Sequence, residues 1–167
     1  TQGADDGARR RRNPRIVGAA ARWPSGAWSD RQLLQLAQTG SDAVGQVPVE
    51  RWLIDDAEVR NPAVRYAATI PHAELFDEAR FAISSAEAAW MDPQQRLLME
   101  KGYEALHVSG HARQSLLANA IAVVVGIQAT DYTNIALATP SAALPVYAVS
   151  GFTFSVAAGR LSYVLGM

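Results

Sequence analysis

The sequence of 167 residues contains no cysteine, which excludes disulfides, thiolate metal ligands and a cysteine nucleophile within these residues. Lysine occurs only at Lys101, and no Gly-x-x-x-x-Gly-Lys-Ser/Thr phosphate loop is present. Long hydrophobic runs are also missing, because the longest, 120–127, is far too short to cross a bilayer. The sequence opens on polar residues rather than on a signal peptide. We therefore expect a cytoplasmic protein with no membrane partner.

An excess of charge of either sign is absent too, since 15 basic and 16 acidic side chains leave a net charge of −1. This balance excludes a generally basic nucleic-acid surface, and we expect no nucleic-acid partner. Four consecutive arginines at 9–12 are the one basic cluster, and a tether for an acidic surface is one interpretation of them. Their small and polar neighbours favour a flexible leader over 1–15, followed by a single domain over 16–167.

The hydrophobic pattern predicts strands alternating with helices. Capping residues and apolar spacing favour helices at 30–40, 85–90, 93–110 and 155–165. In the last of these, Val156, Gly159, Leu161 and Tyr163 are the expected packing positions. Short apolar runs favour buried strands at 15–20 and 120–126, the second covered by helices on both faces. This order predicts an α/β layered sheet.

Between the first two helices, residues 42–76 lack a clean period of either 2 or 3.6. Three prolines interrupt this stretch, which predicts an irregular excursion with one hairpin. We expect Val47, Trp52, Leu53 and Tyr66 to pack it against the rest of the domain. A loop of this length in a compact domain is usually functional or interfacial.

A self-contained catalytic or metal-binding signature is missing from the sequence. His107 and His111 have the spacing that places two imidazoles on one helix face, but Gly110 between them favours surface histidines at a helix end, and no metal site. Asp131 and Tyr132 follow the second predicted strand, where open α/β sheets place ligand-facing loops. Ordinary loop polarity explains these two residues equally well.

Six blocks stand out along the chain. They are IVGAAARWP at 16–24, DAVGQVPVERW at 42–52, FDEARFAIS at 76–84, MDPQQRLLME at 91–100, VVVG at 123–126 with Asp131-Tyr132, and SVAAGRLSYVLG at 155–166. In this order they resemble the β-ketoacyl synthase domain of modular type I polyketide synthases. The fourth block is nearly diagnostic by itself, and the resemblance covers residues 16–167.

The resemblance implies the thiolase-like layered α/β fold, of which this sequence would hold only the N-terminal half. It also implies a decarboxylative Claisen condensation of an acyl thioester with a malonyl-type extender, in polyketide or fatty acid biosynthesis. No cofactor would be bound directly, because the substrates arrive on the phosphopantetheine arm of an acyl carrier protein. That carrier, other polyketide synthase domains and a second copy of the chain in a homodimer would be the partners.

In the family, the nucleophilic cysteine and two assisting histidines lie beyond the segment that matches Gly166-Met167. We therefore expect the sequence to stop before the nucleophile strand, with no catalytic residue in this chain and no activity of the chain alone. His72, His107 and His111 do not match the family's histidines. A catalytically silent, ketosynthase-like scaffold or specificity partner is the alternative.

Two groups of residues receive roles from this resemblance. A structural motif, comprising Asp92, Pro93, Gln94, Gln95 and Arg96, is expected to cap a helix and to pin it to the sheet rather than to catalyse. Counting back without gaps from 158–160 places Ala148 and Val149 at positions that line the acyl tunnel. Small apolar side chains suit that role, although packing in a loop core is an equal alternative.

The sequence also departs from the family pattern. Ala82 and Ser85 replace the usual glycine and proline of the family's Gly-Ile-Ser-Pro stretch, and the excursion over 55–75 is shorter than usual. A domain half should leave 123–125 partly uncovered, and an uncovered apolar strand favours association. We therefore expect the isolated chain to be poorly soluble or to dimerise.

Overall fold

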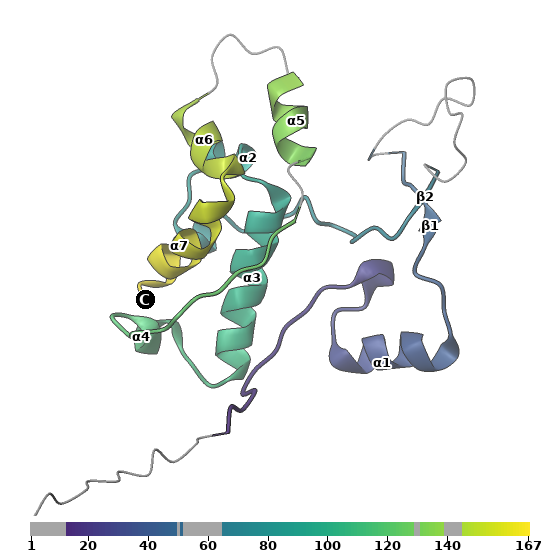
Figure 1. Ribbon diagram of the computed structural model, residues 1–167, viewed down its shortest axis with the longest axis horizontal. Helices are drawn as coiled ribbons and strands as arrows, with labels where there is room; N and C mark the ends of the chain where they lie inside the picture. Colours follow the sequence, from purple (N-terminus) through teal and green to yellow (C-terminus); the bar gives the residue numbers. More distant parts are fainter. Residues whose placement is uncertain (1–12, 50, 52–64, 129–130, 139–144) are drawn as a thin grey trace, which may run out of the picture.

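Helices dominate the computed structural model, which describes residues 13–49, 51, 65–128, 131–138 and 145–167 (Figure 1). The helices are η1 (Pro24–Gly26), α1 (Asp30–Thr39), η3 (Ala79–Phe81), α2 (Ser85–Ala89), α3 (Pro93–Val108), α4 (Arg113–Leu116), α5 (Asp131–Ala138), α6 (Val146–Phe152) and α7 (Phe154–Leu165). The described part of the chain holds one sheet, in which β1 (Gly45–Gln46) pairs antiparallel with β2 (Tyr66–Ala67). No helix within the described ranges is long and apolar enough to span a membrane.

Local capping sets the starts of α1 and α2, as the sequence predicts. The Ser29 hydroxyl accepts a hydrogen bond from the Gln32 N–H at the start of α1, and the Ser84 hydroxyl accepts one from the Glu87 N–H at the start of α2. α1 ends at Gly40, whose φ of 61° is the left-handed conformation that glycine adopts without strain. The helices predicted at 30–40, 85–90, 93–110 and 155–165 are thus confirmed.

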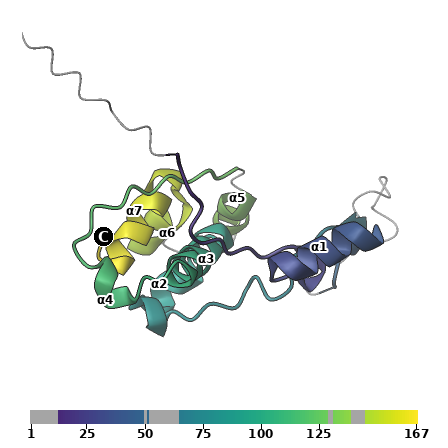
Figure 2. The ribbon, with the colours of Figure 1, turned by 90° about the horizontal axis from the view of Figure 1, so that it is seen from below.

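The core forms where α3 and α7 lie side by side (Figures 1 and 2). Gly102 allows this close approach, because a Cβ atom there would lie only 2.9 Å from a methyl carbon of Leu161. The central buried side chains are Phe81, Ile83, Ala88, Met91, Met99, Leu116, Leu161 and Leu165. Of the α7 positions expected to pack, Leu161 is buried and Val156 is half-buried, whereas Gly159 and Tyr163 face outward.

The two predicted strands at 15–20 and 120–126 are wrong in the structure. Neither segment belongs to a sheet, and the Ile16 side chain is 92% exposed. Residues 121–128 run extended with burial that alternates along the chain: Ile121 and Val123 pack on the core, whereas Val124 is 95% exposed. An extended segment becomes a sheet strand only through hydrogen bonds to a neighbour. The described residues place no such neighbour beside either segment.

Among the described residues, the excursion over 42–76 contains the antiparallel strand pair, with Gly45 opposite Ala67, as the predicted hairpin requires. Val47 is buried as expected, but Tyr66 is largely exposed. Trp52 and Leu53, also expected to pack here, lie outside the described residues. The strand pair and α1 lie to one side of the helical core and form a side region (Figure 1).

Arg22 connects this side region to the helical core. One of its guanidinium nitrogens donates to the Pro71 and His72 carbonyl oxygens at 2.7 and 3.0 Å, and the other lies 3.7 Å from the Glu100 carboxylate on α3. The resemblance block at 16–24 therefore contributes a link between distant segments instead of a strand.

Ala82 stands where the resembled family usually carries glycine, and its backbone conformation is one that favours glycine. Its φ of 54° lies in the left-handed region, which disfavours a Cβ atom and suits the glycine that the family usually carries there. We expect Ala82→Gly to stabilise the fold by about 0.5–1 kcal/mol, after the added freedom of the unfolded chain is subtracted. Thermal unfolding would measure this, with Ala89→Gly as the control that loses stability. A lower midpoint for Ala82→Gly would contradict the assignment.

Candidate functional site

The α2–α3 turn and the start of α3 carry the block MDPQQRLLME at 91–100. Asp92 is buried, and one oxygen of its carboxylate accepts from the Gln94 N–H at 2.7 Å. Pro93 occupies the first helical position, where the missing N–H leaves no hydrogen bond unmade. The predicted cap is therefore confirmed. Asp92 satisfies a free N–H group of the first turn of α3, and its negative charge lies at the positive end of the helix.

In the described part of the chain, Gln95 and Arg96 bind helix ends and loops, and the predicted pin to a sheet is not seen there. The Arg96 guanidinium donates to the Met91 carbonyl at 3.1 Å and to the Glu74 carbonyl at 3.2 Å. The Gln95 amide reaches the junction of α6 and α7 instead. The physical reason is the position of the strands: β1 and β2 lie in the side region, and the first turn of α3 faces other helices.

The α6–α7 junction packs directly on the α2–α3 turn. A Cβ atom on Gly151 would lie 2.1 Å from the Trp90 carbonyl oxygen, so only glycine fits at this contact. The same contact includes a backbone hydrogen bond of 3.1 Å from the Asp92 N–H to the Gly151 carbonyl. Two segments about sixty residues apart in sequence thus form one rigid backbone contact. Sequence reasoning missed this contact, for which the only local signal is a glycine inside a helix.

Ala148 and Val149, the expected tunnel positions, lie on α6 and not in a loop. Their side chains have different surroundings: Ala148 is 1% exposed, whereas Val149 is 72% exposed. Successive helical residues project about 100° apart, which separates one buried neighbour from one free neighbour. Of these two residues, only Val149 therefore presents its side chain to a space outside the packed core.

Aromatic side chains surround the same junction. Phe152 makes edge contacts with Trp90 and with Tyr132, at centroid distances of 6.5 and 5.8 Å. The Tyr132 hydroxyl donates to the Ala89 carbonyl at 2.9 Å, which ties the start of α5 to α2. Asp131 is exposed in the first turn of α5. The 131–132 pair thus begins a helix, and Tyr132 is used in packing.

Comparison with known proteins decides the family of this arrangement. The β-ketoacyl synthase N-terminal domain matches residues 14–167, nearly the whole chain. The chain belongs to the β-ketoacyl synthase family. It is 34% identical over 158 residues to a mycocerosic acid synthase-like polyketide synthase of Mycolicibacterium smegmatis, covering 91% of this chain and 7% of that protein. It is 38% identical over 152 residues to the polyketide synthase GfsA of Streptomyces halstedii, covering 91% and 2%.

Solved ketosynthases share the fold. The ketosynthase from module 6 of the bacillaene synthase of Bacillus subtilis 168 superposes with a TM-score of 0.72 at 27% identity, over 91% of this chain and 24% of that one. An oxazolomycin ketosynthase domain of Streptomyces albus JA3453 gives a TM-score of 0.71 at 26% identity, over 90% and 27%. The chain therefore has part of the thiolase-like fold and spans about a quarter of a solved ketosynthase.

The residues that form this junction include no cysteine and no histidine. The chain has no cysteine, and His72 and His107 are exposed on separate segments. His107 stacks on Tyr103 in the last turns of α3, and His111 follows the helix. Among the described residues, no three histidine or acidic side chains gather as a metal site. The two histidines are thus surface groups near a helix end, as predicted.

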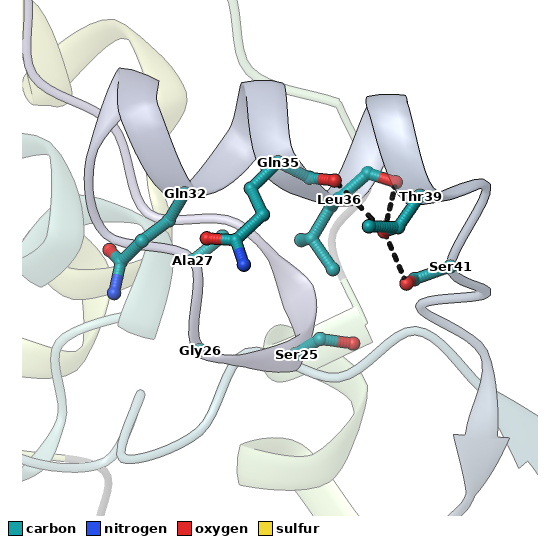
Figure 3. Close-up of a pocket in the computed structure, with 8 residues that line it drawn as sticks. All are labelled: Ser25, Gly26, Ala27, Gln32, Gln35, Leu36, Thr39 and Ser41. Carbon is teal, nitrogen blue, oxygen red and sulfur yellow. Dashed lines mark hydrogen bonds between the residues drawn. The ribbon is translucent and has the colours of Figure 1, made fainter.

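Several cavities in the described part of the chain lie away from the junction. A cavity of about 280 Å³ between η1 and α1 is lined by Ser25, Gly26, Ala27, Gln32, Gln35, Leu36, Thr39 and Ser41 (Figure 3). Its lining carries no ionisable side chain. The Thr39 hydroxyl bonds the Gln35 carbonyl at 2.8 Å and contacts the Ser41 hydroxyl at 2.7 Å, so these polar groups are already satisfied. General acid or base catalysis is not available from this lining.

The second cavity, of about 240 Å³, lies between η3 and α3 and includes Glu100. Burial raises the pKa of Glu100 above its ordinary value of 4.5, and the nearby Asp77 and Glu104 charges act in the same direction. Arg22 and Lys101 lower this pKa but do not cancel the effect of burial. The free-energy cost of removing the Glu100 carboxylate from water is therefore larger than the stabilisation of its charge by Arg22 and Lys101.

This imbalance predicts the pH dependence of stability. The folded state holds the Glu100 proton more tightly than the unfolded state, so this contribution is fully present below pH 4.5 and is lost as the pH rises through the raised value. We expect Glu100→Gln to reduce the change of the thermal midpoint with pH between about pH 4 and pH 7. The midpoint near pH 7 should rise slightly. Asp30→Asn, at an exposed carboxylate in the first turn of α1, is the control. An unchanged slope for Glu100→Gln would contradict the prediction.

Proposed function

We propose that this chain works as the N-terminal part of a ketosynthase that condenses an acyl thioester with a malonyl-type extender. The observation that carries the proposal is the family match over 14–167. The named relatives are polyketide synthases, which favours polyketide over fatty acid biosynthesis. The extender would arrive on the phosphopantetheine arm of an acyl carrier protein, and the chain would bind no cofactor directly.

The chemistry of the condensation assigns this chain a supporting role. Acyl transfer from a thioester needs a thiolate nucleophile and donors for the developing oxyanion. With no cysteine among its 167 residues, the chain supplies no such nucleophile, and we expect it to be inactive alone. The nucleophile and its two histidines would belong to the part of a ketosynthase that this chain does not match.

The contribution we assign to the chain is one wall of the acyl site, at Ala148 and Val149. The free, apolar Val149 side chain supports a contact with an acyl chain, because such a surface offers no hydrogen bond and excludes water. Ala148 would support this wall from beneath, since its side chain is packed inside the chain. In a homodimer, a second copy would face this wall.

The working assembly would lie in the cytosol, with further polyketide synthase domains beside it. The segment 121–128, with burial that alternates along the chain, supports assembly with more polypeptide, because it joins no sheet within the described residues and its Val124 side chain is exposed. We expect the chain alone to elute as a dimer or larger species in size-exclusion chromatography. A monomer that melts cooperatively would contradict this expectation.

The test of the proposed function uses the full product of the gene. Acyl- and malonyl-carrier proteins are supplied, and mass spectrometry detects the β-ketoacyl carrier protein. We expect condensation by the full product and none by the chain alone. A full product that binds the carrier but forms no β-ketoacyl species would overturn the proposal in favour of a silent, ketosynthase-like scaffold.

A further inference from the structure

The Gln95 side chain makes an unusual set of contacts for a residue in the first turn of a helix. Its amide nitrogen donates to the Gly151 carbonyl at 3.0 Å and lies 3.3 Å from each of the Ser150 and Thr153 carbonyl oxygens. These acceptors are more than fifty residues away in sequence. The Gln95 side chain is 1% exposed, so water does not compete for its hydrogen bonds.

The orientation of this amide follows from its surroundings. All three groups at the α6–α7 junction are carbonyl oxygens, which only accept hydrogen bonds, and the NH₂ end of Gln95 must therefore face them. The amide oxygen of Gln95 is buried without a hydrogen-bond partner. A buried, unpartnered acceptor costs stability, and this cost is offset only where the NH₂ end makes valuable contacts. The hydrogen bonds of the Gln95 amide group are therefore made at the α6–α7 junction.

The junction itself explains why these contacts have value. The last carbonyl groups of a helix lack partners within that helix. α6 ends at Phe152, and α7 begins two residues later, after the extended Thr153. The Thr153 hydroxyl bonds the Val149 carbonyl, and the Asp92 N–H bonds the Gly151 carbonyl. Gln95 donates to the Ser150 carbonyl and binds Gly151 a second time.

We propose that Gln95 is the positioning residue for the acyl-binding wall, because it holds the C-terminal end of α6 and thereby fixes where Val149 points. The inference rests on the proposed function for its acyl ligand, but the hydrogen bonds and the burial stand independently. The neighbouring Gly151 fixes the distance between α6 and the α2–α3 turn, and Gln95 fixes the rotation of the helix end. Val149 precedes the first of the three bonded carbonyls by one residue.

The test replaces Gln95 by methionine, which has a similar length but cannot donate, in the full ketosynthase that carries this chain. Acyl loading is followed with acetyl, butyryl and octanoyl thioesters. We expect KM for the octanoyl primer to rise about tenfold, with kcat and the acetyl KM changed by less than about threefold. Hydrogen exchange should quicken in the peptide over 145–153, while the peptide over 97–106 keeps its protection.

Gln38→Met, at an exposed position on α1, is the matched control and should leave all loading constants and exchange rates unchanged. If Gln95→Met is insoluble, Gln95→Asn retains the amide group on a side chain that is one methylene shorter. We then expect a smaller rise in KM for the octanoyl primer. An equal rise in KM for all primers, or unchanged hydrogen exchange over 145–153, would overturn the positioning role. Failure of the unmodified ketosynthase to load any primer would instead overturn the proposed function.

Discussion

Replacing Gly151 by alanine is expected to lower the free energy of unfolding by about 3 kcal/mol, because the new Cβ atom has no space. That atom would lie 2.1 Å from the Trp90 carbonyl oxygen and 3.0 Å from its carbon, and both are backbone atoms that cannot rotate away. Relief would require moving α6 from the α2–α3 turn. The movement would break the hydrogen bond from the Asp92 N–H and the contacts of Gln95.

The chain offers a matched control for this prediction. Gly159 lies in α7, faces outward, and would find no atom within 4 Å of an added Cβ. Alanine favours a helix interior over glycine, so Gly159→Ala should stabilise by about 0.5–1 kcal/mol. Thermal unfolding of the ketosynthase that carries each variant measures both effects. Equal midpoints for the two variants would refute the tight contact at Gly151.

Replacing Val149 by tryptophan is expected to reduce kcat/KM for an octanoyl primer about a hundredfold and that for an acetyl primer less than about threefold. Val149 is exposed on α6, so the indole ring does not enter the core, and the thermal midpoint should stay within about 2 °C. In the proposed tunnel the ring would occupy volume that only a long acyl chain needs. Loading rates across primers of increasing length measure the effect.

Two further variants separate a tunnel effect from a folding defect. Ala148→Trp places the same ring at a buried position, where overpacking should lower the stability and reduce loading of every primer equally. Val44→Trp makes the same valine substitution as Val149→Trp in the side region, and loading should be unchanged. If Val149→Trp reduced acetyl and octanoyl loading alike, Val149 would not line the tunnel.

The helices α1, α2, α3 and α7 could be predicted from the sequence because the information that specifies them is local, whereas α4, α5 and α6 were not predicted. Ser29, Ser84 and Asp92 each cap a helix through an N–H group two or three residues away. Such patterns need no knowledge of the rest of the fold. The strand predictions failed for the opposite reason. The apolar runs at 15–20 and 120–126 need a partner to form a sheet, and their composition does not specify one.

The candidate site was predictable only in part, because its main contacts join distant segments. The sequence indicated that the block at 91–100 caps and anchors a helix, and the cap at Asp92 is confirmed. It gave no sign that Gln95 binds carbonyl groups at 150–153, or that Gly151 touches Trp90. Counting along the chain placed Ala148 and Val149 together, whereas the helix that contains them turns one inward and the other outward.

We propose that this chain is a segment of a ketosynthase that carries the acyl-site wall but not the nucleophile. Intact-mass spectrometry after incubation with an acyl thioester tests it most directly. The account predicts no covalent adduct on the chain alone, which has no cysteine, and a single acyl group on a cysteine of the full gene product. An acyl adduct that forms on the chain alone and turns over with a malonyl-type extender would contradict the account.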